Sequence, residues 1–175
     1  MATASVETER PRVRTLIAPL FSTRTAPLPT DIALIAVRAT LALLFIYHGS
    51  RRLFGWFDGP GLDASATFFA HTAGLTPGTF FAVLSGLIEF GGGIAIAFGF
   101  LTRLAGLAIF GDMMMAIITV EWVQGINSTG GNEGWELNLA LGMLAFVVAL
   151  FGAGRVSIDA LIDRRLSPAP APEAR

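Results

Sequence analysis

The sequence contains no cysteine and no lysine, and it has few charged residues of either sign. Without a thiol, the chain itself can neither exchange disulfides nor ligate an iron–sulfur cluster, and it cannot attach a c-type haem covalently. Charged residues make up 14% of the chain, against about 25% in soluble domains. The 12 basic and 13 acidic residues nearly balance, so the charge gives no indication of a nucleic-acid partner. The length of 175 residues allows one compact domain.

Apolar residues make up 53% of the chain and gather into four segments. A helix of about 20 apolar residues spans the roughly 30 Å hydrocarbon core of a bilayer. A soluble four-helix bundle would need a polar stripe on each helix, and the second and third segments have none of useful width. We therefore predict an all-α bundle of four transmembrane helices, at about residues 32–48, 80–100, 104–122 and 136–151.

Polar tails flank this predicted bundle. Residues 1–30 and 164–175 are rich in proline and polar residues, a composition typical of disorder. We predict both as disordered cytoplasmic tails around one transmembrane domain, residues 31–163. The residues after the first apolar segment do not suit signal-peptide cleavage, so we expect that segment to stay in the chain. The first connection, 49–79, is long for a small bundle, and its segment Ala64–Ala73 (ASATFFAHTA) is expected to form a short helix against the membrane.

The arginines give the predicted bundle an orientation, because cytoplasmic loops of membrane proteins carry an excess of positive charge. If both termini are cytoplasmic, the opposite side holds only Arg51 and Arg52. Trp56, Trp122 and Trp135 then all lie at the outer interface, where aromatic side chains gather. We predict both termini on the cytoplasmic side. The arginines of that side are Arg10, Arg12, Arg14, Arg24, Arg103, Arg155, Arg164 and Arg165.

Three ionisable residues, Arg38, Glu89 and Asp112, fall at membrane depth within the predicted helices. Such groups are costly in hydrocarbon, so a function is a reasonable first hypothesis. Counting about 1.5 Å per residue places all three within a turn or two of one level. We predict that Arg38 is the counter-ion of one or both carboxylates, and that the excess acid holds a proton or meets another cation or water. The cluster is then part of a proton path; an ion pair that only fixes helix register is the alternative.

A second polar group gathers where the predicted helices reach the outer interface. A histidine beside carboxylates and indole rings can hydrogen-bond a quinone carbonyl and transfer its proton. Solvation at the interface is the alternative for most of these residues, and carboxylates near a helix N-terminus need no function. The residues predicted to bind quinone are His48, Arg51, Arg52, Trp122, Trp135 and Glu136. The wider rim also includes Tyr47, Glu121, Asn132, Glu133 and Asn138.

Four stretches of the chain, within about residues 32–163, form a recognisable pattern. They are Arg38-Ala-Thr-Leu-Ala-Leu-Leu-Phe-Ile-Tyr-His48-Gly49 with Leu53-Phe54-Gly55, Gly86-Leu-Ile-Glu89-Phe-Gly-Gly-Gly93 with Gly99-Phe-Leu-Thr-Arg103, Met113-Met-Met-Ala116, and Glu136 with Gly152-Ala-Gly-Arg155-Val-Ser157-Ile-Asp159. In their order and spacing these stretches resemble the DoxX family of small four-helix bacterial membrane proteins. One difference from the family pattern is Arg52, where the family usually has lysine; the charge is kept, but an amine that can lose its proton is not.

The resemblance implies a protein of the bacterial plasma (inner) membrane with a redox-linked role. Members of the family are associated with terminal quinol oxidases, with thiosulfate:quinone oxidoreduction and with complexes that protect bacteria from oxidative and thiol stress. We predict no metal site and no intrinsic cofactor; quinone is the ligand considered. The expected partners are the lipid bilayer, other proteins of a redox complex and a second copy of the chain in a homodimer.

Three functions compete on these observations. The first is a quinone-linked oxidoreductase subunit that receives its electrons from a partner protein or a substrate. The second is a non-catalytic scaffold that anchors soluble redox enzymes, with the N-terminal tail and the segment after Arg155 as docking elements. The third is transport of a small solute or proton through the bundle. The sequence gives the first two equal weight and the third less.

Overall fold

A computed structural model describes residues 28–127 and 134–166, and within these ranges the chain is helical without any strand. Proline and glycine mark the helix ends, as at Pro77 before the second long helix and Gly99 after it. The helices are α2 (Leu28–Phe54), α3 (Gly61–His71), α4 (Gly78–Phe98), α5 (Thr102–Ala116) with a π-helical turn (Ile117–Glu121) and a 3₁₀ turn (Trp122–Gln124), α6 (Glu136–Phe151) and α7 (Ile158–Leu166).

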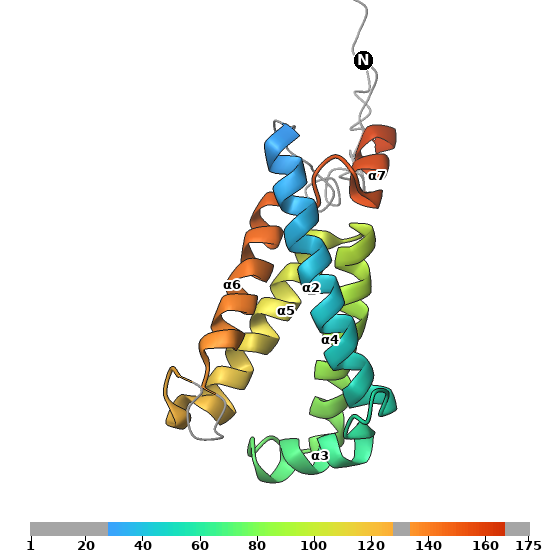
Figure 1. Ribbon diagram of the computed structural model, residues 1–175. Helices are drawn as coiled ribbons and strands as arrows, with labels where there is room; N and C mark the ends of the chain where they lie inside the picture. The colour runs from blue at the N-terminus through green and yellow to red at the C-terminus, as the bar shows by residue number, and fades with distance from the viewer. Residues whose placement is uncertain (1–27, 128–133, 167–175) are drawn as a thin grey trace, which may run out of the picture.

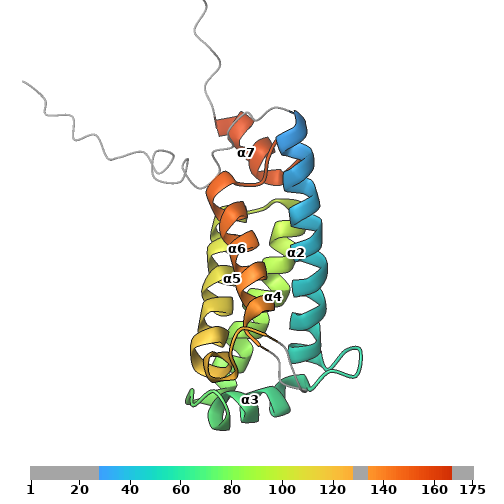
Figure 2. The ribbon, with the colours of Figure 1, turned by 60° about the vertical axis from the view of Figure 1, so that its left-hand side comes forward.

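The helices form two antiparallel pairs, α2 with α4 and α5 with α6, which lie side by side in a bundle (Figures 1 and 2). The short helix α3 lies across one end of the bundle, and α7 packs at the other end (Figure 1). We call these the α3 end and the α7 end. In Figure 1 the two pairs diverge toward the α3 end, where the connection between α2 and α4 closes the bundle.

Three of the helical stretches, Leu28–Phe54, Gly78–Phe98 and Thr102–Gln124, are long and apolar enough to cross a membrane. The fourth, Glu136–Phe151, is apolar but shorter. Large apolar side chains such as Leu43 and Ile118 are exposed on the outside of the bundle, as expected of helices that face lipid rather than water. The predicted fold class, an all-α membrane bundle, is therefore confirmed. The number of crossings and the cytoplasmic placement of both termini stay predictions.

Glycines set the register of α2 against α4. A Cβ atom added to Gly49 would lie 2.4 Å from the backbone nitrogen of Phe90, and one added to Gly93 would lie 2.9 Å from that of Ile46. No real side chain fits at such distances, so the two helices approach each other this closely only through glycine. Since the helices are antiparallel, this register brings the last turns of α2 level with the middle of α4.

The core lies where the two pairs meet. Leu41 of α2, Ile96 of α4, Ile109 of α5 and Val148 of α6 are fully buried and pack in one cluster. Each comes from a different long helix, so the cluster holds both pairs together. Because lipid replaces water outside a membrane bundle, this contact is stabilised by close packing more than by removal from water.

The α7 end is built around Arg38, which is 5% exposed. Its guanidinium donates hydrogen bonds to Ile96 O (3.0 Å), Ala97 O (3.0 Å), Ala153 O (2.7 Å) and Val156 O (2.9 Å). The first two carbonyls belong to the last turn of α4, where backbone oxygens have no partner within the helix. Arg38 thereby ties α2 and α4 to the segment that follows α6.

Two carboxylates complete this connection. Asp159 of α7 accepts hydrogen bonds from the backbone nitrogens of Leu101 (2.8 Å) and Thr102 (3.0 Å), at the start of α5. Asp31, in the first turn of α2, forms an ion pair with Arg155. We call Asp31, Arg38, Arg155 and Asp159 the α7-end latch. It explains why the Gly152–Asp159 stretch of the sequence is polar although it belongs to the folded domain.

The helix bounds differ from the predicted ones mainly at the ends of the chain. Helix α2 begins at Leu28, before the predicted domain start at residue 31, and α7 extends to Leu166, beyond the predicted domain end at residue 163. The short helix predicted at Ala64–Ala73 is present as α3, slightly earlier in the chain. The tail predictions for 1–27 and 167–175, and the rim residues Asn132 and Glu133, lie outside the described residues.

Candidate functional site

An ion pair between α2 and α4 lies near the α3 end. Arg52 Nε donates to Glu89 Oε2 (3.1 Å) and Nη2 donates to Oε1 (2.9 Å), a two-point contact that fixes both side chains. Glu89 is 3% exposed. The guanidinium carbon of Arg52 lies 5.2 Å from the ring centre of Phe69, so α3 covers the pair with an aromatic face.

This pair corrects the prediction for Arg38, which was expected to neutralise Glu89 and Asp112. That prediction is wrong, because the N-terminal part of α2 projects past the end of α4 (Figure 1). Arg38 therefore reaches the last carbonyls of α4 instead of its middle. The guanidinium that meets Glu89 comes from Arg52, which the sequence had placed at the rim.

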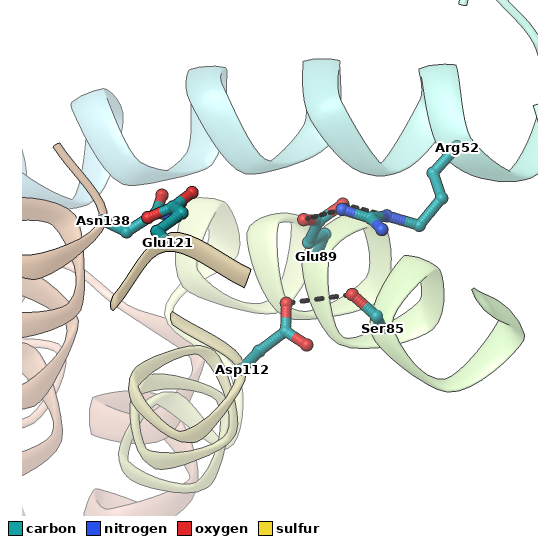
Figure 3. A network of polar contacts seen from close by, with 6 residues as sticks. All are labelled: Arg52, Ser85, Glu89, Asp112, Glu121 and Asn138. Carbon is teal, nitrogen blue, oxygen red and sulfur yellow. Dashed lines mark hydrogen bonds and ion pairs between the residues drawn. The ribbon is translucent and has the colours of Figure 1, made fainter. Parts of the chain in front are cut away.

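Asp112 lies on α5, opposite α4. Its Oδ2 atom accepts a hydrogen bond from the Ser85 hydroxyl (3.1 Å), and its side chain is half-buried. Neither of the two ion pairs in the described part of the chain includes Asp112. Figure 3 shows its carboxylate directed toward Ser85 and the Arg52–Glu89 pair. Two carboxylates and one guanidinium thus share a small region between the helix pairs.

A third polar contact joins α6 to the end of α5. The Asn138 side-chain nitrogen donates to Glu121 Oε1 at 2.6 Å. Glu121 follows Asp112 by about two and a half turns of an ideal α-helix, which would put the two on opposite faces. The π-helical turn Ile117–Glu121 turns the chain by less per residue and brings Glu121 round toward the side of Asp112.

These polar groups line one cavity of about 240 Å³, formed by α2, α3, α4, α5 with its π-helical turn, and α6. Figure 3 shows six of its polar side chains from four of these segments. Of the other lining residues, His48 and Thr119 are polar and the rest are apolar. The lining residues are Phe45, His48, Arg52, Phe68, Phe69, Ser85, Glu89, Asp112, Met113, Met115, Ala116, Thr119, Val120, Glu121, Leu137, Asn138 and Leu141.

The cavity opens on the side of the bundle. Phe68 of α3 is 41% exposed, Met115 of α5 is 45% exposed and Leu137 of α6 is 59% exposed, although all three line it. His48 of α2 is also exposed. The exposed part of the rim is thus mostly apolar; Met115 and Leu137 belong to the side walls of the bundle, and Phe68 belongs to α3 at its end. An opening of this kind faces lipid more than water.

The cavity joins residues from both groups that the sequence predicted separately. His48 and Arg52 from the predicted quinone site, and Glu89 and Asp112 from the predicted proton path, line the same space. Ser85, Glu121 and Asn138 line it too; Glu121 and Asn138 were predicted only as part of the wider rim, and Ser85 was not among the predicted site residues. Their signal was weak: an isolated serine on an apolar helix and two polar residues at an interface have many ordinary explanations.

Five predicted site residues do not line this cavity: Arg38, which lies at the α7 end, and four of the six residues predicted to bind quinone. Trp122 and Trp135 stack on each other with ring centres 6.3 Å apart, and Glu136 is exposed in the first turn of α6. Arg51 donates to Phe57 O (2.6 Å) and lines a second cavity, of about 220 Å³, between the end of α2 and α3. Of the six residues of the predicted quinone site, only His48 and Arg52 line the larger cavity, and these two also line the second cavity beside Arg51.

No group of histidine and acidic side chains within residues 28–127 and 134–166 has an arrangement that suits a metal ion.

The fold and the cavity define a class of protein: a small helical membrane bundle with charged residues at membrane depth. The sequence model of the DoxX family matches residues 33–122, about half the chain. The chain belongs to the DoxX family. The matched region contains Arg52, Glu89 and Asp112, but it ends before α6 and Asn138.

Two bacterial membrane proteins are similar to this chain. It is 30% identical to inner membrane protein YqjF of Escherichia coli over 137 residues, which cover 77% of this chain and 95% of that protein. It is 28% identical to the uncharacterized membrane protein Rv3486 of Mycobacterium tuberculosis over 146 residues, 76% of this chain and 83% of that protein. No solved structure matches the chain.

Proposed function

We propose that this chain is the quinone-linked membrane subunit of a redox complex, and that the cavity at the α3 end receives the quinone head group. One observation carries the proposal: His48, Arg52, Glu89 and Asp112 line a single cavity whose exposed rim is mostly apolar. A quinone dissolves in the bilayer and would enter from the side. A bound quinone supplies the chemistry that the chain lacks, transfer of two electrons and two protons.

The residues of the cavity fit such a head group. Arg52 keeps N–H groups beyond the two that it donates to Glu89, and His48 carries a ring nitrogen able to donate. Both can hydrogen-bond a carbonyl oxygen. The side chains of Phe45 and Phe68 offer flat apolar surface for a ring. The volume of about 240 Å³ suits a head group and leaves an isoprenoid tail outside.

Glu89 and Asp112 would serve as proton acceptors and donors beside that head group. Both lie at membrane depth and both line the cavity. Ser85 holds the Asp112 carboxylate by one oxygen and leaves the other accessible. Arg52 holds Glu89 by both oxygens, so Asp112 is the better candidate for taking up a proton and Glu89 for keeping the guanidinium in place.

Purification of the full chain in a mild detergent, with mass spectrometry of the co-purified lipids, tests the proposal. We expect menaquinone or ubiquinone in near-stoichiometric amount. Arg52→Gln should reduce it about tenfold, the effect of losing one hydrogen bond from a charged group worth about 1.5 kcal/mol. Glu136→Gln, which changes a predicted site residue outside the cavity, is the matched control and should retain the quinone.

A wild-type protein without quinone would contradict the proposal. If stoichiometric soluble redox enzymes were recovered instead, the scaffold function would be supported. The scaffold function would also be supported by two results together: equal amounts of quinone in wild type and Arg52→Gln, and loss of partner proteins when residues 1–27 are removed. A scaffold depends on docking segments and not on the cavity.

A further inference from the structure

Asp112 has a polar partner but no counter-ion in the part of the chain that the structure describes. Ser85 donates to Oδ2, and Oδ1 accepts no hydrogen bond from the described residues. Arg52, the guanidinium that shares the cavity, donates to both oxygens of Glu89 instead. A carboxylate at membrane depth without a counter-ion is costly. A positively charged ligand would therefore be stabilised at Asp112.

The rest of the wall suits a cation that has an apolar body. Phe45, Phe68, Met113 and Leu141 line the space beside the carboxylate. Aromatic faces attract cations through the negative charge of the ring face. Methionine side chains adapt their shape to different apolar groups. A compact hydrated metal ion would gain little from such a wall, whereas an organic ammonium ion uses both its charge and its apolar part.

The position of the cavity opening further restricts which ligands can enter. Of the exposed rim residues, Met115 and Leu137 lie on the sides of the bundle and Phe68 lies on α3 at its end, so a ligand that enters past Met115 and Leu137 comes from the bilayer. Amphiphilic amines partition into bilayers with the charged nitrogen near the interface. The cavity volume of about 240 Å³ is below the roughly 300–1,000 Å³ of pockets that enclose a drug-sized ligand. It therefore accommodates an amine head with a short apolar body.

We propose that this cavity binds a lipophilic ammonium ion, whose N–H group donates to Oδ1 of Asp112 while its apolar body lies against Phe45 and Phe68. The proposal goes beyond quinone binding, because a neutral quinone gains no ion pair with Asp112. The two ligands would compete for one space. The charge balance favours the ammonium ion, since Arg52 offsets only one of the two carboxylates, Glu89 and Asp112.

The test uses the full chain in nanodiscs of a neutral phosphatidylcholine, with empty nanodiscs to subtract partition into lipid. The probes are 4-phenylbutylamine, an ammonium ion at pH 7, and 4-phenylbutan-1-ol, its neutral match in size. Isothermal titration should show saturable binding of the amine at least tenfold tighter than that of the alcohol. Asp112→Asn should remove this difference. Asp63→Asn, which neutralises an exposed carboxylate on α3, should leave it unchanged.

Equal affinities of wild type for amine and alcohol would overturn the proposal, as would absence of saturable amine binding. Both outcomes are read on wild type, so they do not depend on whether Asp112→Asn folds. A second variant, Ser85→Ala, keeps the carboxylate and removes its hydrogen-bond donor; amine binding should be kept or strengthened, and a tenfold loss would contradict the proposal. Neither probe is a quinone, so the result is independent of whether quinone co-purifies.

Discussion

At each end of the bundle an arginine of α2 contacts α4, but the two arginines have different partners. Arg38 and Arg52 are about four turns apart, so they lie on one face of α2. At the α7 end, Arg38 is 5% exposed and donates to four backbone carbonyls. At the α3 end, Arg52 meets one carboxylate beside a cavity that contains another.

This difference supports our proposal that the α3 end binds a ligand, whereas the α7 end stabilises the fold. In the α7-end latch, each charged group is satisfied by a partner within the fold, which is what stability requires of buried charge. At the α3 end, Asp112 lacks a counter-ion among the described residues and the helix pairs diverge around open space. We therefore expect substitutions in the latch to change stability, and substitutions at the cavity to change ligand binding with smaller effects on stability.

Arg38→Met should have the largest effect on stability. Methionine preserves the length and apolar stem of the side chain but removes the donor to four backbone carbonyls, of which Ile96 O keeps a hydrogen bond from Gly99 N (3.1 Å). A buried acceptor left without a donor costs about 1–3 kcal/mol, and Arg38 serves several of them, so this loss should exceed that of the other variants. Reversible unfolding in mixed dodecyl maltoside–SDS micelles measures the change. Arg164→Met, at an exposed position of α7, is the control and should change the unfolding free energy by less than about 0.5 kcal/mol.

Asp159→Ala should have the next largest effect. Asp159 is 2% exposed and accepts hydrogen bonds from two backbone nitrogens at the start of α5. Its removal leaves both donors without a partner, at a cost of about 1–3 kcal/mol, and should also loosen α7. The same unfolding assay, with Asp163→Ala of α7 as control, measures it. Equal effects of the two substitutions would contradict the assignment of Asp159 to the latch.

The Arg52–Glu89 pair should contribute less to stability than the latch. Its arginine side chain is 25% exposed, so solvent weakens the attraction. A double-mutant cycle with Arg52→Gln and Glu89→Gln should give a coupling energy of about 1–2 kcal/mol. The single variants should lose bound ligand more than they lose stability. A coupling energy larger than the losses of unfolding free energy measured for the latch variants would contradict the proposed difference between the two ends.

Much of the fold could be predicted because apolar runs and their breakers are local features of the sequence. The bounds of α6, Glu136–Phe151, are those predicted, and α4, Gly78–Phe98, begins and ends two residues before the predicted 80–100. The DoxX family resemblance is confirmed. The carboxylates Glu89 and Asp112 could be found for the same reason, since a single charged residue within an apolar run needs no knowledge of the partner helix.

The partners of those carboxylates could not be found from the sequence. Each turn added to a helix end moves a side chain by about 5.4 Å along the axis, and α2 extends beyond the predicted 32–48 at both ends. That extension is enough to move Arg38 to the end of α4 and Arg52 to Glu89. Glu121 reaches the cavity through a π-helical turn, which has no clear sequence signal.

The smallest effect on stability is expected for Arg51→Gln, which is the closest control for Arg52→Gln. Arg51 precedes Arg52 in α2 but points away from Glu89, donating to Phe57 O (2.6 Å) and to the Tyr47 hydroxyl (3.2 Å) in an exposed setting. Exposed contacts of this kind contribute little, so stability should change by less than about 0.5 kcal/mol.

Ligand retention in the larger cavity should also be unchanged in Arg51→Gln, because Arg51 does not line that cavity. The two arginines are adjacent in sequence, identical in charge and equally near the interface. A general attraction of positive charge for lipid head groups would therefore make Arg51→Gln and Arg52→Gln alike. A loss of ligand confined to Arg52→Gln would instead show that the direction of the side chain, and not the local charge, determines binding at the α3 end.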